Sequence, residues 1–277
     1  MLDKTEGNPL FVEETVRMLL EQGVDGGDRI PDTLQAMIGA RIDRLPAGEK
    51  ILLQRASVIG RTFWAGAVDH LSPEYHGDEL EDMLTEVNFS PDDRLVSVGD
   101  LISKGPKNRE VLDRFMIDPQ FSAVIGNHDL AIRRRLNGEK FKLNASQKLV
   151  KKELKKDKER YLSYLNSLPF LIDLGTHLVV HAGLRPGVAL HSQTTEDMTE
   201  LRSLGKDRSA RHGTPWYEEY DGEKVVLFGH WPSPEPRRGR KAIGLDTGCV
   251  YGKKLTAYII ETEEFKTVPA RETYDPN

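Results

Sequence analysis

Short β-branched segments alternate with helical segments from about residue 78 to the end of the chain. Buried strands joined by helices are typical of α/β folds, in which the ends of neighbouring strands meet along one edge of a sheet. Several of these segments end in small polar clusters, which are Gly99-Asp100, Gly126-Asn127-His128-Asp129, His181-Ala182-Gly183 and Gly229-His230. Strands that carry Asp, Asn and His at their carboxyl ends predict an α/β active site.

The residue types in these clusters indicate a metal site. Asp100 offers a carboxylate that can bridge two cations, Asn127 offers a neutral oxygen, and His181 and His230 offer imidazole nitrogens. A mixed set of oxygen and nitrogen donors suits Mn, Fe, Co or Zn better than Ca. A single histidine after a strand is more often structural, so the hypothesis depends on all the clusters occurring in order. His128 follows Asn127 and is placed to act on a leaving group rather than to bind metal.

The ordered motifs resemble those of a known enzyme family. The segments "VGDLISKGP", "VIGNHDL", "VVHAGL", "FGHW" and "LDTGCVYGKKLTA" are similar to calcineurin-like metallophosphoesterases, and more narrowly to symmetrical dinucleoside tetraphosphatases and their ApaH-like bacterial relatives. The resemblance covers about Asp78 to Ala270. It implies a β-sandwich flanked by helices, and a hydrolase that cleaves phosphoester or phosphoanhydride bonds in substrates such as dinucleoside polyphosphates.

The same resemblance implies roles for individual residues. The family's second metal would be held by Asp100, Asn127, His181 and His230, and the family's general acid would be His128. The family binds two divalent ions, and the acid protonates the departing oxygen.

Two cationic residues are candidates for binding the substrate's phosphate. Lys104 stands where the family usually has a phosphate-clamping arginine, and a lysine supplies a point charge without the bidentate fork. Arg202, in "ELRSL", is either a second clamp or a solvated surface arginine. The residues from Asp246 to Cys249 resemble a structural turn of the family. Cys249 is expected to fill space there rather than to act as a nucleophile.

The family's first motif, Gly-Asp-x-His-Gly, is absent from all 277 residues. Its Asp and His would hold the first metal. An ungapped match places Ser72 and Glu74 in those two positions, whereas a two-residue deletion places Glu74 and His76 there. Because metal sites tolerate positional errors of only about 0.2 Å, we expect the first site to be empty or weak and the chain to bind one ion.

Residues 1–73 have a different pattern, which predicts a small all-helical domain. "TEGNPLFVEE", "IPDTLQAMIGARIDRLP" and "LLQRASVIGRTFWAGAV" resemble the helical and winged-helix part of STAND-type signalling ATPases. The phosphate-binding loop G-x-x-x-x-G-K-[ST] is absent, so we expect no ATP binding by this segment. The sequence thus predicts two domains, a helical segment at 1–73 and a metallophosphoesterase domain at 78–277. The second domain would lack its first strand, or have a poor substitute at 61–70.

Charge, cysteine content and apolar runs limit the kinds of partner and the cellular compartment that we expect for this chain. The net charge of −5, from 39 basic and 44 acidic residues, does not indicate a nucleic-acid binder. The basic stretch "KLVKKELKKDKER" predicts a helix with a solvated charged face. The single cysteine excludes an intramolecular disulfide, and the sequence shows neither a membrane-spanning run nor a signal peptide. We therefore expect a cytoplasmic protein that acts on a small phosphorylated substrate.

Three hypotheses for the activity remain open from sequence. In the first, the chain is a working phosphohydrolase in which Glu74, His76 or water completes the first metal site. In the second, which we favour, it is a phosphoesterase with one metal and impaired turnover. In the third, it is an inactive fusion or a regulatory module that binds a partner.

Overall fold

The structure is a computed structural model that describes residues 78–276. Several predictions concern residues outside this part of the chain and stay predictions. They are the helical segment 1–73, the strand substitute at 61–70, and Glu74 and His76 at the junction. Within the described residues, no helix is both long enough and apolar enough to cross a membrane.

Short strands form the layers of the fold in residues 78–276. They are β1 (Leu95–Ser97), β2 (Phe121–Ala123), β3 (Leu171–Asp173), β4 (His177–Val180), β5 (Ser203–Leu204), β6 (Thr214–Pro215), β7 (Val225–Phe228), β8 (Arg237–Arg238), β9 (Ala242–Gly244), β10 (Lys254–Ile259) and β11 (Glu264–Pro269). One sheet has the order β3-β4-β7-β9-β8, with β4, β7 and β9 parallel and both edge strands antiparallel. β1 and β2 form a parallel pair, and β10 and β11 form an antiparallel hairpin.

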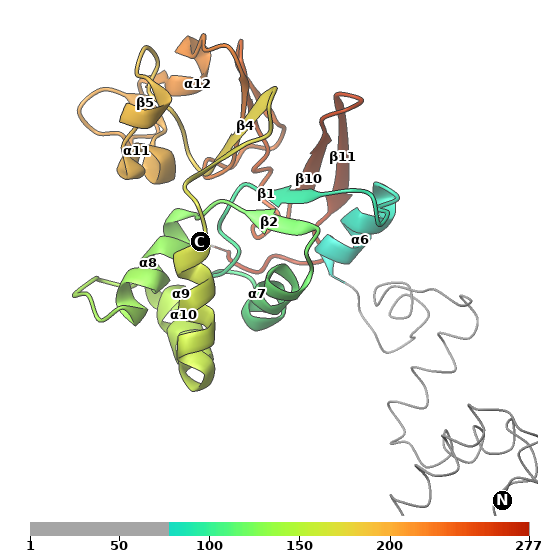
Figure 1. Cartoon of the computed structure of the whole chain (residues 1–277), viewed down its shortest axis with the longest axis vertical. Coiled ribbons are helices and arrows are strands. Elements are labelled where there is room, and N and C mark those ends of the chain that lie inside the picture. The colour runs from blue at the N-terminus through green and yellow to red at the C-terminus, as the bar shows by residue number, and fades with distance from the viewer. Residues whose placement is uncertain (1–77, 277) are drawn as a thin grey trace, which may run out of the picture. The chain divides into compact units, whose positions relative to one another are not determined.

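One apolar cluster joins these separate sheets. Its buried members are Val124, Val179 and Leu227, and Val96, Val98 and Tyr258 pack against them. These residues come from β1 or β2 and the residues just after them, from β4 and β7 of the larger sheet, and from β10 of the hairpin. The sheets therefore share one core as a β-sandwich (Figure 1), and the predicted α/β sandwich flanked by helices is confirmed.

The helices lie between the strands in sequence. They are α6 (Glu79–Glu86), α7 (Asn108–Ile117), α8 (Asn127–Leu136), α9 (Ala145–Glu153), η1 (Leu154–Asp157), α10 (Lys158–Ser167), η2 (Leu190–Ser192), α11 (Thr195–Glu200) and α12 (Trp216–Glu219). Asp78 caps α6 by accepting a hydrogen bond from the Glu81 N–H at 3.1 Å, which explains why this helix begins there. Helices α8, α9 and α10 gather on one side of the β1–β2 pair (Figure 1).

The basic stretch folds differently from the single helix that its spacing predicts. Val150, Leu154, Tyr161 and Leu165 are all buried, as expected for one apolar face. However, the 3-10 turn η1 separates α9 from α10, and Asp157 at the end of that turn pairs with Arg109 at 2.6 Å. The turn lies between the two helices, and both of them pack against α8.

Candidate active site

The loops that follow four strands carry the predicted site residues. Asp100 follows β1, Asn127 follows β2 and begins α8, His181 follows β4, and His230 follows β7. β1 and β2 are parallel neighbours, and so are β4 and β7, so each pair presents its carboxyl ends at one edge. Packing of the two sheets then brings the two edges together.

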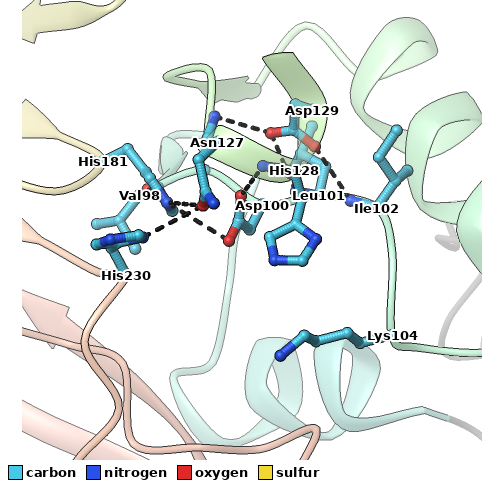
Figure 2. A network of polar contacts seen from close by, with 12 residues as sticks. Val98, Asp100, Leu101, Ile102, Lys104, Asn127, His128, Asp129, His181 and His230 are labelled. Atoms are coloured by element: carbon cyan, nitrogen blue, oxygen red, sulfur yellow. Dashed lines mark hydrogen bonds and ion pairs between the residues drawn. The ribbon is translucent and has the colours of Figure 1, made fainter. Parts of the chain in front are cut away.

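Donor atoms of these four side chains converge on one point, as Figure 2 shows. The His181 Nε2 lies 3.1 Å from the Asn127 Oδ1 and 3.4 Å from the Asp100 Oδ2. The His230 Nδ1 lies 3.2 Å from the same Asn127 oxygen. The structure therefore brings together all four residues, as the order of the strands predicted, while their role as metal ligands stays a prediction.

When the His181 ring is neutral, lone pairs of His181, Asn127 and Asp100 face one another at this point. The His181 Nδ1 lies 2.8 Å from the Val98 carbonyl oxygen, which can only accept, so Nδ1 carries the proton. In the neutral ring Nε2 then presents a lone pair toward the oxygens of Asn127 and Asp100, which also accept. A cation among these atoms would turn that repulsion into attraction.

The spacing of the atoms also fits a divalent metal ion. Ligands held at about 2.1 Å from a transition metal lie about 3.0–3.4 Å from one another, depending on the geometry. The three separations above fall in this range. No three His, Cys, Asp or Glu side chains of residues 78–276 are arranged to hold a metal by themselves. The site thus depends on the Asn127 oxygen, which lies between the two imidazoles.

His230 is held as a neutral ring. Burial is the main cause that moves its pKa well below the usual value, and His181, Arg202 and His128 lower the pKa further. Its Nε2 is buried without a hydrogen bond of acceptable geometry. A neutral imidazole is the form that binds metal, so this environment suits a ligand.

The His128 ring lies beside the converging donors, while the His128 backbone holds one of them. Its backbone N–H donates to the Asp100 Oδ1 at 3.0 Å, and its ring Nδ1 lies 3.4 Å from the Gln147 amide nitrogen. Figure 2 shows the ring in the space between Asp100 and Lys104. Burial lowers the pKa of His128, while the negative charge of Asp100 opposes that shift. The ring is placed to act on a bound group rather than to complete the donor set.

Asp129 organises the loop that carries Asp100, although its role was not recognised from sequence. The carboxylate is fully buried and accepts hydrogen bonds from the N–H groups of Gly126, Leu101 and Ile102 at 2.9, 3.3 and 3.2 Å. Burial, followed by the charge of Asp100, raises its pKa. Asp129 belongs to the quoted "GNHD" cluster, but only the three-dimensional contacts reveal that it ties the end of β1 to α8.

Close backbone contacts and strained residues concentrate at this site. A Cβ added at Gly126 would lie 2.1 Å from the Asp100 Oδ1 and 2.3 Å from the Asp100 backbone nitrogen. Positive φ angles occur at Asp100 (56°), Ser103 (85°), Lys104 (67°) and His230 (64°), although none of these is glycine. Such conformations cost about 1–3 kcal/mol each and are kept where they serve function.

The contact at Gly126 leads to a first prediction. Changing Gly126 to alanine should push Asp100 away from Asn127 and lower the free energy of unfolding by about 1–3 kcal/mol, because the new methyl overlaps backbone and side-chain atoms. Chemical denaturation measures this loss. Gly105→Ala is the control, because the added Cβ meets open space and the φ angle of Gly105 is not in the left-handed region. Equal losses in the two variants would contradict a specific overlap at Gly126.

The two cationic candidates both lie near the donor set. The Lys104 amine contacts the Tyr251 hydroxyl and lies 3.3 Å from the Asp275 Oδ2. Arg202 donates to the backbone carbonyls of Ser209 at 3.0 Å and His230 at 3.3 Å. Burial lowers the pKa of Arg202, and its Nε is buried without a partner. Arg202 is thus half-buried and has two backbone partners, and its role as a clamp stays a proposal.

Cys249 has the properties of a filler. Burial, followed by the charges of Glu79 and Asp246, raises the pKa of its thiol to about 12. A thiol this weakly acidic carries almost no thiolate at neutral pH, and thiolate is the nucleophilic form. The environment thus favours the structural interpretation of this residue.

Comparisons with known proteins agree with the geometry. The family model for calcineurin-like phosphoesterases matches residues 74–266. The asymmetrical bis(5'-nucleosyl)-tetraphosphatase PrpE of Bacillus subtilis is 29% identical over 65% of this chain and 81% of its own length. A symmetrical bis(5'-nucleosyl)-tetraphosphatase of Vibrio parahaemolyticus is 29% identical over 70% of this chain and 94% of its own length.

A solved structure gives the same result for the fold. It is described provisionally as a diadenosine tetraphosphatase, is 30% identical, and superposes with a TM-score of 0.60. The match covers 69% of this chain and 87% of that protein.

Proposed function

The chain belongs to the calcineurin-like phosphoesterase family, and we propose that it hydrolyses dinucleoside polyphosphates or related phosphoesters at the site around Asn127. The single observation that carries the proposal is the convergence of carboxylate, amide and imidazole groups at the ends of four strands. Relatives named as dinucleoside tetraphosphatases support the choice of substrate class.

A divalent metal belongs to the chemistry of this family, and the donor set fits one. Asp100, Asn127, His181 and His230 would hold it, and the mixture of oxygen and nitrogen favours Mn, Fe, Co or Zn. When bound, such an ion activates water and stabilises charge on the phosphoryl oxygens. Only one complete donor set lies within the described residues, and the sequence lacks the motif for a second one. We therefore propose one tightly held ion, with Glu74 and His76 contributing little.

The chain's own residues would perform the remaining steps. Lys104 and Arg202 supply positive charge for the phosphates, and His128 gives its proton to the departing oxygen. Burial disfavours the charged form of His128, but a phosphate dianion beside the ring favours it. Substrate binding would thus favour the protonated form of His128, which is the form that can act as an acid.

A steady-state assay tests the proposed function. Hydrolysis of diadenosine tetraphosphate and of an aryl phosphate should be at least about 10² slower than in a relative with the complete first motif, and millimolar manganese should restore part of the loss. The control variants are Glu74→Ala and His76→Ala, which should change turnover little. Full activity that collapses in either control would show a remodelled first site. No turnover at any manganese concentration would favour the inactive or regulatory alternative.

A further inference from the structure

The side chain of Lys104 is held by residues from the end of the chain. Its amine contacts the hydroxyl of Tyr251, which lies 147 residues further along, and sits 4.6 Å from the centre of that ring. The Asp275 Oδ2 is a second partner at 3.3 Å. Figure 2 shows the amine directed into the space beside His128 and Asp100. Any anion that enters this space therefore meets a lysine that already has two partners.

These two partners belong to one small structural unit. Tyr251 forms an isolated antiparallel bridge with Thr273. The backbone N–H groups of Tyr274 and Asp275 both donate to the Val250 carbonyl, at 3.0 and 2.8 Å. The C-terminal segment is thus fastened to the turn that carries Tyr251, and both side chains reach Lys104 from fixed backbone positions. This arrangement also brings Tyr251 within electrostatic range of Arg202, the second cationic candidate.

The two partners differ in what they do to an incoming phosphate. A lysine amine has three N–H donors, so it can keep one partner while it binds a new one. A tyrosine hydroxyl such as that of Tyr251 has no carboxylate charge to repel a phosphate on the same amine. The Asp275 carboxylate carries the same sign of charge as phosphate. A carboxylate and a phosphate that contact the same amine therefore repel each other. The neutral partner is therefore compatible with bound phosphate, and the anionic partner competes with it.

We propose that Tyr251 is a positioning residue that holds the Lys104 amine toward the substrate, and that Asp275 is an internal anion which the substrate's phosphate displaces. The proposal deepens the proposed function, because it takes Lys104 as a phosphate-binding residue. It assigns opposite effects to two residues that touch the same amine. A purely structural role would instead give both residues effects of the same sign.

The test is a calorimetric titration of the manganese-loaded chain with inorganic phosphate. Tyr251→Phe keeps the ring and removes the hydroxyl, so it should weaken phosphate binding by about 5-fold, a typical consequence of losing a hydrogen bond to a charged group. Asp275→Asn removes the competing charge and should strengthen binding by about 2- to 5-fold, as expected for a partly exposed ion pair. KM for an aryl phosphate should shift in the same two directions while kcat changes little.

Matched controls separate these effects from general ones. Tyr258→Phe removes a hydroxyl from β10, and Glu272→Gln removes a charge from the same C-terminal segment. Neither residue is among the hydrogen-bond or ion-pair partners of Lys104 in the described residues. Both controls should bind phosphate like the unaltered chain. In a Lys104→Ala background the effects of Tyr251→Phe and Asp275→Asn should disappear, because the shared partner is gone.

Several outcomes would overturn the proposal. They are shifts of the same sign in the two variants, shifts that persist without Lys104, and shifts equal to those of the controls. If the chain binds phosphate but does not hydrolyse substrate, the proposed function is wrong. The phosphate titration then still tests the roles of Tyr251 and Asp275. If the unaltered chain binds no phosphate, both proposals fail.

Discussion

Changing Asp100 to alanine is expected to lower phosphohydrolase turnover by about 10³-fold or more, and to abolish tight metal binding. One oxygen of this carboxylate lies 3.4 Å from the His181 Nε2 at the centre of the donor set, and the other accepts the His128 N–H at 3.0 Å. The change therefore removes a donor and also releases the start of α8. Steady-state kinetics with millimolar manganese, together with a manganese titration, measure both losses.

Asp92→Ala is the matched control, because Asp92 is an exposed carboxylate in the turn before β1. It should leave turnover and metal affinity unchanged. If Asp100→Ala kept its metal and lost only a few-fold in turnover, the donor set would not be the catalytic centre. Thermal unfolding of both variants shows whether a loss reflects chemistry or a failure to fold.

Changing His128 to alanine is expected to lower kcat by about 10²–10⁴-fold while leaving metal affinity unchanged. The ring lies beside Asp100 but contacts none of the three side chains that meet at the Asn127 oxygen. The loss of kcat caused by removing a general acid should also depend on the leaving group. An aryl phosphate with an acidic phenol needs little protonation, so it should lose much less than phenyl phosphate, whose phenol is a poorer leaving group.

His191→Ala serves as the control, since His191 is exposed in η2 and has no hydrogen bond or ion pair in the described structure. An equal loss for the two substrates would argue against proton donation by His128. A loss of metal affinity in His128→Ala would instead place the ring among the ligands. Either result would change the role assigned to this residue.

The convergence of four predicted site residues could be anticipated from sequence because their positions follow from strand order. Asp100, Asn127, His181 and His230 each lie within a few residues of the carboxyl end of a strand, and parallel pairing places such residues at a common edge. The burial of the apolar face that includes Val150 in the basic stretch was likewise predictable from the spacing of its residues. These predictions needed only local patterns and one general rule of sheet geometry.

Other parts of the site could not be predicted, because they depend on contacts between distant segments. The Tyr251 hydroxyl and the Asp275 carboxylate reach Lys104 only through the folding of the C-terminal segment against the turn at Val250. Gln147 reaches His128 from α9, across a helix–helix contact that no local pattern specifies. The 3-10 turn that separates α9 from α10 was missed for the same reason, since the apolar spacing continues through it.

The most direct test of the central claim is the metal content of the purified 277-residue chain after equilibration with manganese and removal of free ion. The donor set around Asn127 predicts about one ion per chain, and His181→Ala should reduce this to almost none, because that ring lies 3.1 Å from the Asn127 oxygen and 3.4 Å from Asp100. His191→Ala should keep the full content. Two ions per chain, or a content that does not change in His181→Ala, would contradict the one-metal site proposed at these four residues.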